Sequence, residues 1–166
     1  MAASKSAIET LKLYLSKIKD ALEAGDATEH THRPALKDLI ESLDAGITAV
    51  NEPKRVSCGA PDYAVKRRNL SIGYIEAKDV GKSLDEAEDS DQLERYKKSL
   101  HNLILTDYLE FRWYVDGELR GTARLARQRK GKLVSDRDGV EETAEILNDF
   151  LSHNPEPIAD PQKLSE

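Results

Sequence analysis

Two neighbouring segments in the middle of the chain carry the pattern of a β-hairpin. Residues 71–78, Ser-Ile-Gly-Tyr-Ile-Glu-Ala-Lys, have the aromatic and β-branched content of a strand. The preceding Lys-Arg-Arg-Asn at 66–69 has the polarity of a turn. The pattern predicts paired strands at about 61–66 and 70–78, so any fold of this chain has to contain a β-sheet built around them.

The predicted hairpin would bring three charged side chains together. On a strand, Glu76 and Lys78 point to the same face, about 6.6 Å apart, and Ala77 faces away. Asp62 lies near the start of the partner strand, beside Glu76 if the register allows. Two adjacent carboxylates repel each other unless a cation lies between them, and Mg²⁺ accepts such oxygen ligands. A water molecule held near Lys78 would then be a candidate nucleophile.

A structural interpretation competes with this one. Alternating charge on a half-solvated strand often produces Glu-x-Lys, and that fragment alone is structural more often than catalytic. The complete pattern adds the Gly-Ala-Pro-Asp entry at 59–62 and the hairpin that follows it. Chance explains this combination poorly, which favours a functional site.

The order Pro61-Asp62, then Glu76-Ala77-Lys78, resembles the PD-(D/E)XK nuclease superfamily. The resemblance covers about 29–113. More narrowly, Glu-His-Thr-His-Arg-Pro at 29–34 and the run at 103–108 resemble the N-terminal nuclease modules of single-chain restriction-modification enzymes.

The resemblance implies an α/β, restriction-endonuclease-like core, in which helices flank a mixed β-sheet. It also implies a magnesium-dependent DNA endonuclease, a hydrolase in which Mn²⁺ can replace Mg²⁺. The implied metal ligands are Asp62, Glu76, the carbonyl of Ala77 and the N-terminal acidic residue Glu29. The other implied catalytic residues are Lys78, which would orient water and stabilise phosphate charge, and the Gln-x-x-x-Tyr pair Gln92 and Tyr96. Without the resemblance, Tyr96 would be interpreted as a core residue and Gln92 as a solvated one.

The distribution of charge limits how such a nuclease could bind DNA. The net charge is −6, whereas an autonomous duplex-binding domain is usually basic. Residues 120–132 nevertheless carry six Lys and Arg residues and no acid. Candidate DNA contacts in this segment are Arg124, Arg127, Arg129 and Lys130, although a solvated loop would have the same composition. A basic segment on an acidic domain indicates cleavage of DNA that other domains deliver.

Length and composition predict one domain, at 1–152, followed by a proline-rich linker at 153–166. The linker would lead to a methyltransferase, translocase or target-recognition domain of the same polypeptide. The single cysteine rules out a disulfide framework and favours a cytoplasmic protein. No apolar run is long enough to span a membrane. Cleavage of both DNA strands would require two active sites, and therefore dimerisation or an encounter between two complexes.

Periodicity predicts the remaining elements. Apolar residues at helical spacing predict helices at about 8–22, at 34–43, around 93–100 and at 140–151. Further strands are expected at 103–106, 109–115 and 119–125, with an acidic loop at 85–89.

The sequence is also compatible with two other functions. One is a non-catalytic DNA-binding or assembly module that keeps the nuclease fold, and the other is a freestanding repair or defence nuclease.

Overall fold

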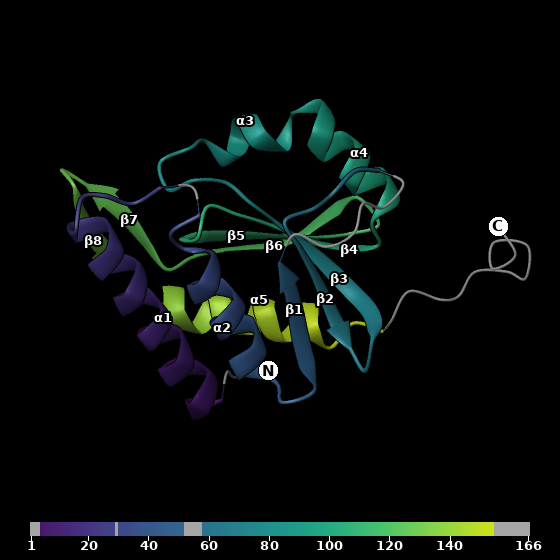
Figure 1. The fold of residues 1–166 in the computed structure, drawn as a ribbon, viewed down its shortest axis with the longest axis horizontal. Helices are drawn as coiled ribbons and strands as arrows, with labels where there is room; N and C mark the ends of the chain where they lie inside the picture. Colours follow the sequence, from purple (N-terminus) through teal and green to yellow (C-terminus); the bar gives the residue numbers. More distant parts are fainter. Residues whose placement is uncertain (1–3, 29, 52–57, 155–166) are drawn as a thin grey trace, which may run out of the picture.

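The chain folds around a six-stranded sheet, with helices on both of its faces (Figure 1). The computed structural model describes residues 4–28, 30–51 and 58–154. In chain order the elements are α1 (Lys5–Glu23), α2 (Arg33–Leu43), β1 (Ile47–Asn51), β2 (Tyr63–Arg67), β3 (Leu70–Ala77), α3 (Leu84–Glu88), α4 (Asp91–Ser99), β4 (Asn102–Thr106), β5 (Glu110–Val115), β6 (Glu118–Arg124), β7 (Ala126–Arg129), β8 (Lys132–Ser135) and α5 (Gly139–Leu151).

The sheet has the strand order β1-β2-β3-β4-β5-β6 and is mixed. Strands β3 and β4 pair in parallel, and every other neighbouring pair in this sheet is antiparallel. The parallel pair requires a crossover connection, which α3 and α4 provide. The expected α/β class, with a mixed sheet between helices, is confirmed.

The predicted hairpin is confirmed as β2 and β3. Its turn residues Arg68 and Asn69 both have positive φ, 52° and 66°, as a tight two-residue hairpin turn requires. Tyr63 pairs with Ile75, so Asp62, one residue before β2, lies across from Glu76.

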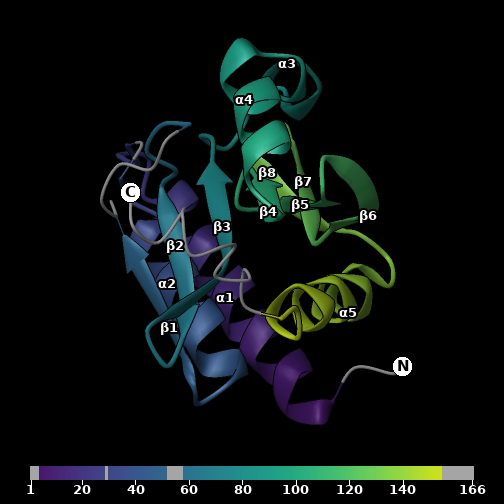
Figure 2. The same cartoon turned by 90° about the vertical axis from the view of Figure 1, so that its right-hand side faces the viewer.

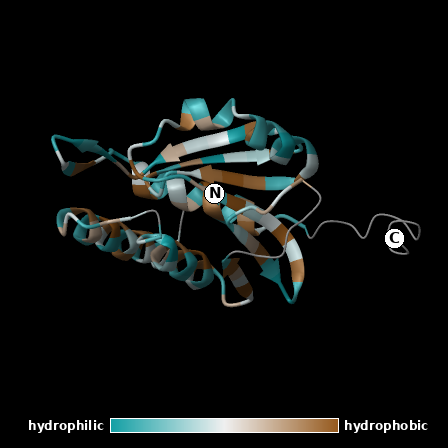
Figure 3. Cartoon of the chain, turned by 45° about the horizontal axis from the view of Figure 1, so that its top comes forward, coloured by the Kyte–Doolittle hydropathy of each residue, from teal (hydrophilic) through white to brown (hydrophobic). Residues whose placement is uncertain are grey.

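Helices α1, α2 and α5 cover one face of the sheet, and α3 and α4 cover the other (Figures 1 and 2). Each face has its own apolar cluster. The larger cluster joins α1, α2 and α5 to the strands, and the smaller one joins α3 and α4 to the central strands. Figure 3 shows hydrophobic residues concentrated on the central strands, whereas the outer helix surfaces are hydrophilic. Because both faces of β3 and β4 are covered, these two strands are almost continuously buried.

The structure corrects the expected acidic loop at 85–89. Residues 84–88 form the short helix α3, whose first turn is capped by the Ser83 hydroxyl, which accepts a hydrogen bond from the Glu86 amide at 3.2 Å. Two acidic side chains hold α3 against β5: Asp85 pairs with Arg112, and Glu88 accepts a hydrogen bond from Tyr114. Acidic side chains in this stretch therefore act as anchors, which polarity alone does not reveal.

The basic segment at 120–132 is not an open loop. It runs through the end of β6 and the hairpin of β7 and β8, which pair in a separate two-stranded sheet. The sequence did not predict this hairpin, because its strands are short and mostly exposed.

In the described part of the chain the last helix, α5, ends at Leu151, and the domain boundary expected at 152 stays a prediction. Most of the expected linker, residues 155–166, lies outside the described residues. In the described part of the chain, no helix has the length and apolar character needed to cross a membrane.

A buried amide on β4 joins four elements. The Asn102 side chain is 1% exposed, and its amide nitrogen donates to the carbonyls of Ile72 on β3 at 2.8 Å and Phe150 on α5 at 3.0 Å. Its amide oxygen accepts a hydrogen bond from the Trp113 indole on β5 at 2.6 Å. Gly73 makes room for this network, since a Cβ there would lie 2.8 Å from the Asn102 nitrogen.

Asn102→Ala is expected to lower the free energy of unfolding by about 2–4 kcal/mol, because two carbonyls and an indole N–H lose a buried partner. Urea titration followed by circular dichroism measures the loss. Asn148→Ala on the exposed face of α5 is the matched control, expected to change stability by less than about 0.5 kcal/mol. Equal stability of the two variants would contradict the assignment of Asn102 as a structural junction.

Candidate active site

The polar residues singled out in the sequence meet at the edge of the sheet where β3 ends. Glu76 is on β3, Lys78 follows it directly, and Asp62 precedes the paired strand β2. The Lys78 amide donates to the Thr106 carbonyl at 2.8 Å, which continues the β3–β4 pairing by one step and holds the backbone of Lys78 in place.

The two carboxylates are held together by reciprocal hydrogen bonds. The Asp62 amide donates to Glu76 Oε1 at 3.2 Å, and the amide of Ala77 donates to Asp62 Oδ2 at 2.8 Å. Each carboxylate is therefore oriented by a backbone N–H from the other strand. This geometry requires the observed hairpin register, because a slip of one residue would turn Glu76 to the opposite face.

Burial and the neighbouring carboxylate make the charged form of Glu76 unfavourable. Glu76 is 4% exposed, and desolvation together with the charge of Asp62 raises its pKa to about 7, despite the opposing effect of Lys78. Raised pKa values of this kind concentrate at functional sites. A cation placed between the two carboxylates would remove the repulsion.

Lys78 is held by two partners. Its ammonium donates to Glu76 Oε2 at 3.2 Å and to Gln92 Oε1 at 3.1 Å. Gln92 in turn donates through Nε2 to the hydroxyl of Tyr96 at 3.4 Å, one turn further along α4. Tyr96 is 1% exposed, so the core interpretation of its ring holds, while its hydroxyl reaches the polar chain.

Arg33, the first residue of α2, was not assigned a role from the sequence. Its Nη2 donates to Asp62 Oδ1 at 3.1 Å, and its Nη1 donates to Asn51 Oδ1 at 3.2 Å. The side chain is only 15% exposed. Its place directly before Pro34 marks a helix start, and nothing in that signal indicates that the helix points its first side chain at the carboxylates.

These groups open into a pocket of about 510 Å³. Its lining combines the site residues with the β3–α3 connection and α3, and consists of Arg33, Asp62, Glu76, Ala77, Lys78, Asp79, Lys82, Ser83, Glu86 and Ala87. Glu29, the expected further metal ligand, lies outside the described residues. Among the residues that are described, no three His, Cys, Asp or Glu side chains are placed to hold a metal ion together.

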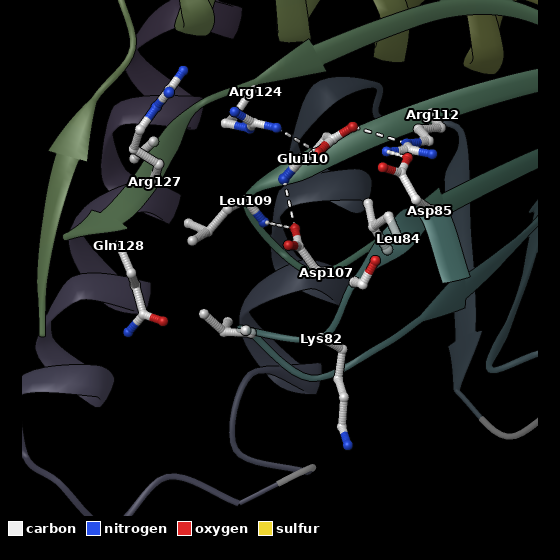
Figure 4. A pocket seen from close by; sticks show the side chains of 14 residues that line it. Lys82, Leu84, Asp85, Asp107, Leu109, Glu110, Arg112, Arg124, Arg127 and Gln128 are labelled. Carbon is white, nitrogen blue, oxygen red and sulfur yellow. Dashed lines mark hydrogen bonds and ion pairs between the residues drawn. The ribbon is translucent and has the colours of Figure 1, made fainter. Parts of the chain in front are cut away.

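The four candidate DNA contacts divide into two pairs. Arg124 on β6 binds Glu110 at 2.9 Å, and Arg127 on β7 binds Asp136 at 2.9 Å, so both are engaged within the chain. Arg129 and Lys130 lie at the exposed turn between β7 and β8. Arg124 and Arg127 border a second pocket, shown in Figure 4, which adjoins the carboxylate pocket.

The stability of the metal-free protein is expected to depend on Glu76 and pH. The pKa of Glu76 is about 7 in the folded state and about 4.5 when unfolded, so the folded state binds the proton more tightly and loses stability as pH rises from 4.5 through 7. In EDTA at pH 8, the free energy of unfolding of Glu76→Gln is expected to be about 2 kcal/mol higher than that of the wild type. This difference is expected to shrink towards pH 5.

Thermal unfolding at several pH values measures this difference. Glu86→Gln, an exposed carboxyl of the same pocket, is the matched control and is expected to show little pH-dependent difference from the wild type. A Glu76→Gln advantage that is the same at pH 5 and pH 8 would show that burial of the charge is not its cause.

No protein-family model and no curated protein matches the sequence. Among solved structures, the chain is similar to one chain of a cryo-electron-microscopy structure of a DrdV–DNA complex, with a TM-score of 0.69 and 19% sequence identity. The similarity covers 93% of this chain but 14% of that chain, so the present chain corresponds to a small part of the larger polypeptide. At this level of identity the similarity establishes the fold: a mixed sheet flanked by helices, shared with a protein that was imaged bound to DNA.

Proposed function

We propose that this chain is a metal-dependent DNA endonuclease domain that hydrolyses phosphodiester bonds. The observation that carries the proposal is the convergence of Asp62, Glu76 and Lys78 at one open pocket, with the two carboxylates hydrogen-bonded into a fixed arrangement. A buried carboxylate, Glu76, beside the partly buried carboxylate of Asp62 is costly for stability alone, and the arrangement suits a site that binds a cation and a phosphate.

The donor set fits a hard divalent cation. Asp62 and Glu76 supply carboxylate oxygens, and Ala77, whose carbonyl is the further expected ligand, lines the same pocket. Mg²⁺ is usually held by one or two carboxylates together with waters and substrate phosphate oxygens, so two carboxylates suffice. Glu29 is proposed as a further ligand on the basis of the resemblance. When bound, the ion would supply Lewis-acid stabilisation of the phosphate and would lower the pKa of water.

The chain's own residues would position the reactants. Lys78 would donate to a non-bridging phosphate oxygen and stabilise the charge that develops as water attacks phosphorus and the leaving ester oxygen departs. Gln92 would keep the Lys78 ammonium directed into the pocket, and Tyr96 would orient the Gln92 amide. Gln92 and Tyr96 are thus positioning residues in this proposal.

DNA is the proposed substrate because the fold is shared with a chain that is bound to DNA. The small fraction of that chain that is covered supports the further proposal that the domain is the cleavage module of a restriction-modification enzyme. In such an enzyme, other domains would select the DNA and two modules would meet for double-strand cleavage.

Lys78→Ala is expected to lower DNA cleavage in Mg²⁺ or Mn²⁺ by about 100-fold or more, while metal binding persists, because the carboxylates remain. Asp62→Ala is expected to abolish both cleavage and metal binding, measured by plasmid nicking and isothermal titration calorimetry. The matched control is Lys12→Ala on the exposed face of α1, with unchanged cleavage. Undiminished cleavage by Lys78→Ala would refute the assignment, and absence of metal binding by the wild type, with DNA present, would favour a non-catalytic module.

Arg33→Gln is expected to tighten metal binding by about tenfold, or about 1.4 kcal/mol, because its guanidinium bonds an oxygen of Asp62 and repels an incoming cation. Manganese titration by calorimetry measures the change without any need for cleavage. Arg67→Gln is the matched control, since Arg67 binds Asp44 at 2.9 Å in a similar way but outside the pocket. Weaker metal binding in Arg33→Gln would instead identify Arg33 as a residue that orients Asp62 for the metal.

A further inference from the structure

A second pocket, of about 420 Å³, adjoins the proposed active site. The two pockets share Lys82 and Ser83, which lie on the connection between β3 and α3. The second pocket continues past the β4–β5 turn to the end of β6 and the start of β7. Both pockets lie along the edge of the sheet at which β3 ends, and the two together are hereafter called the edge groove.

The acidic side chains of the second pocket are already bound within the chain. Figure 4 shows Glu110 between two guanidinium groups, with Arg112 Nε at 2.8 Å and Arg124 Nη2 at 2.9 Å. Asp85 accepts from Arg112 at 2.8 Å, and Asp107 Oδ1 accepts from two backbone N–H groups of the β4–β5 turn, at 2.7 and 3.0 Å. These bonds offset the negative charge of the second pocket.

The cationic side chains retain donors for a ligand. Each guanidinium has five N–H donors. Arg124 donates one of them to Glu110, and Arg127 donates two to Asp136. The two arginine side chains are 39% and 44% exposed, respectively. Lys82 is exposed, and no acidic side chain in the described part of the chain pairs with it. In Figure 4 its ammonium points away from the Glu110 cluster.

We infer that the edge groove binds the phosphodiester backbone of the DNA strand beside the cleaved phosphate, through Lys82, Arg124 and Arg127. This inference rests on the proposed endonuclease function and names how its substrate is held. From β3 to β6 the sheet edge spans three strand spacings, about 14 Å, which equals the rise of about four nucleotides measured along the axis of a duplex. Phosphate contacts of this kind set affinity and position rather than sequence preference.

The test is DNA binding without cleavage. A fluorescent duplex is titrated with the full chain in EDTA at several salt concentrations, and anisotropy gives the dissociation constant. Lys82→Ala is expected to weaken binding about threefold to tenfold and to lower the slope of log affinity against log salt by about one. Arg124→Gln is expected to act in the same direction. The matched control Lys12→Ala, on α1, is expected to keep the wild-type affinity and slope.

Lys82 is the decisive position because it is exposed and contributes no ion pair among the described residues. Its replacement by alanine is therefore expected to keep the fold, which the thermal unfolding midpoint of Lys82→Ala verifies. The inference would be overturned if Lys82→Ala bound DNA with the same affinity and the same salt slope as Lys12→Ala. It would also be overturned if the wild type did not bind DNA at low salt.

The endonuclease proposal is judged separately, by manganese titration and plasmid nicking. Weakened DNA binding in Lys82→Ala, with no metal-dependent cleavage by the wild type, would support the groove and refute the nuclease. Cleavage by the wild type, with unchanged binding by Lys82→Ala, would refute the groove alone.

Discussion

The candidate site depends on the register of one hairpin. Because Tyr63 pairs with Ile75, the amide of Asp62 reaches the carboxylate of Glu76 and the amide of Ala77 reaches that of Asp62. A hairpin shifted by one residue would turn Glu76 to the opposite face of the sheet. The tight turn at Arg68 and Asn69 and a one-residue shift in the pairing between Val65 and Lys66 together set this register, and the apolar clusters on both faces of the sheet hold it.

Helices on opposite faces of the sheet then complete the site. Helix α4 brings Gln92 to the Lys78 ammonium, and α2 begins at Arg33, whose guanidinium binds Asp62. The carboxylates thus lie between two cationic side chains, yet burial and mutual repulsion still raise the pKa of Glu76 to about 7. An arrangement with residual repulsion between carboxylates is suited to bind a divalent cation, and this is the physical basis of the proposed chemistry.

The proposed active site and the proposed DNA-binding groove lie along the same sheet edge of an acidic domain. The acidic side chains of the second pocket are engaged by arginines or backbone amides, as Glu110 and Asp107 show. Helix α3, expected as a loop, is anchored by Arg112 and borders both pockets. Local neutralisation of acids therefore matters more to the groove than the net charge of the chain.

The sequence by itself determined the elements whose periodicity is strong, such as the hairpin and α5, and the side-chain pairs whose spacing is set by one element. Glu76 and Lys78 share a strand face, and Gln92 and Tyr96 share a helix face, because two-residue and four-residue repeats are local properties. Tertiary structure decided which faces meet. The β7–β8 hairpin is local, but its short and mostly exposed strands carry too little alternation to be recognised. Arg33 and Lys82 gain their places from packing between elements distant in sequence, and no local repeat carries that information.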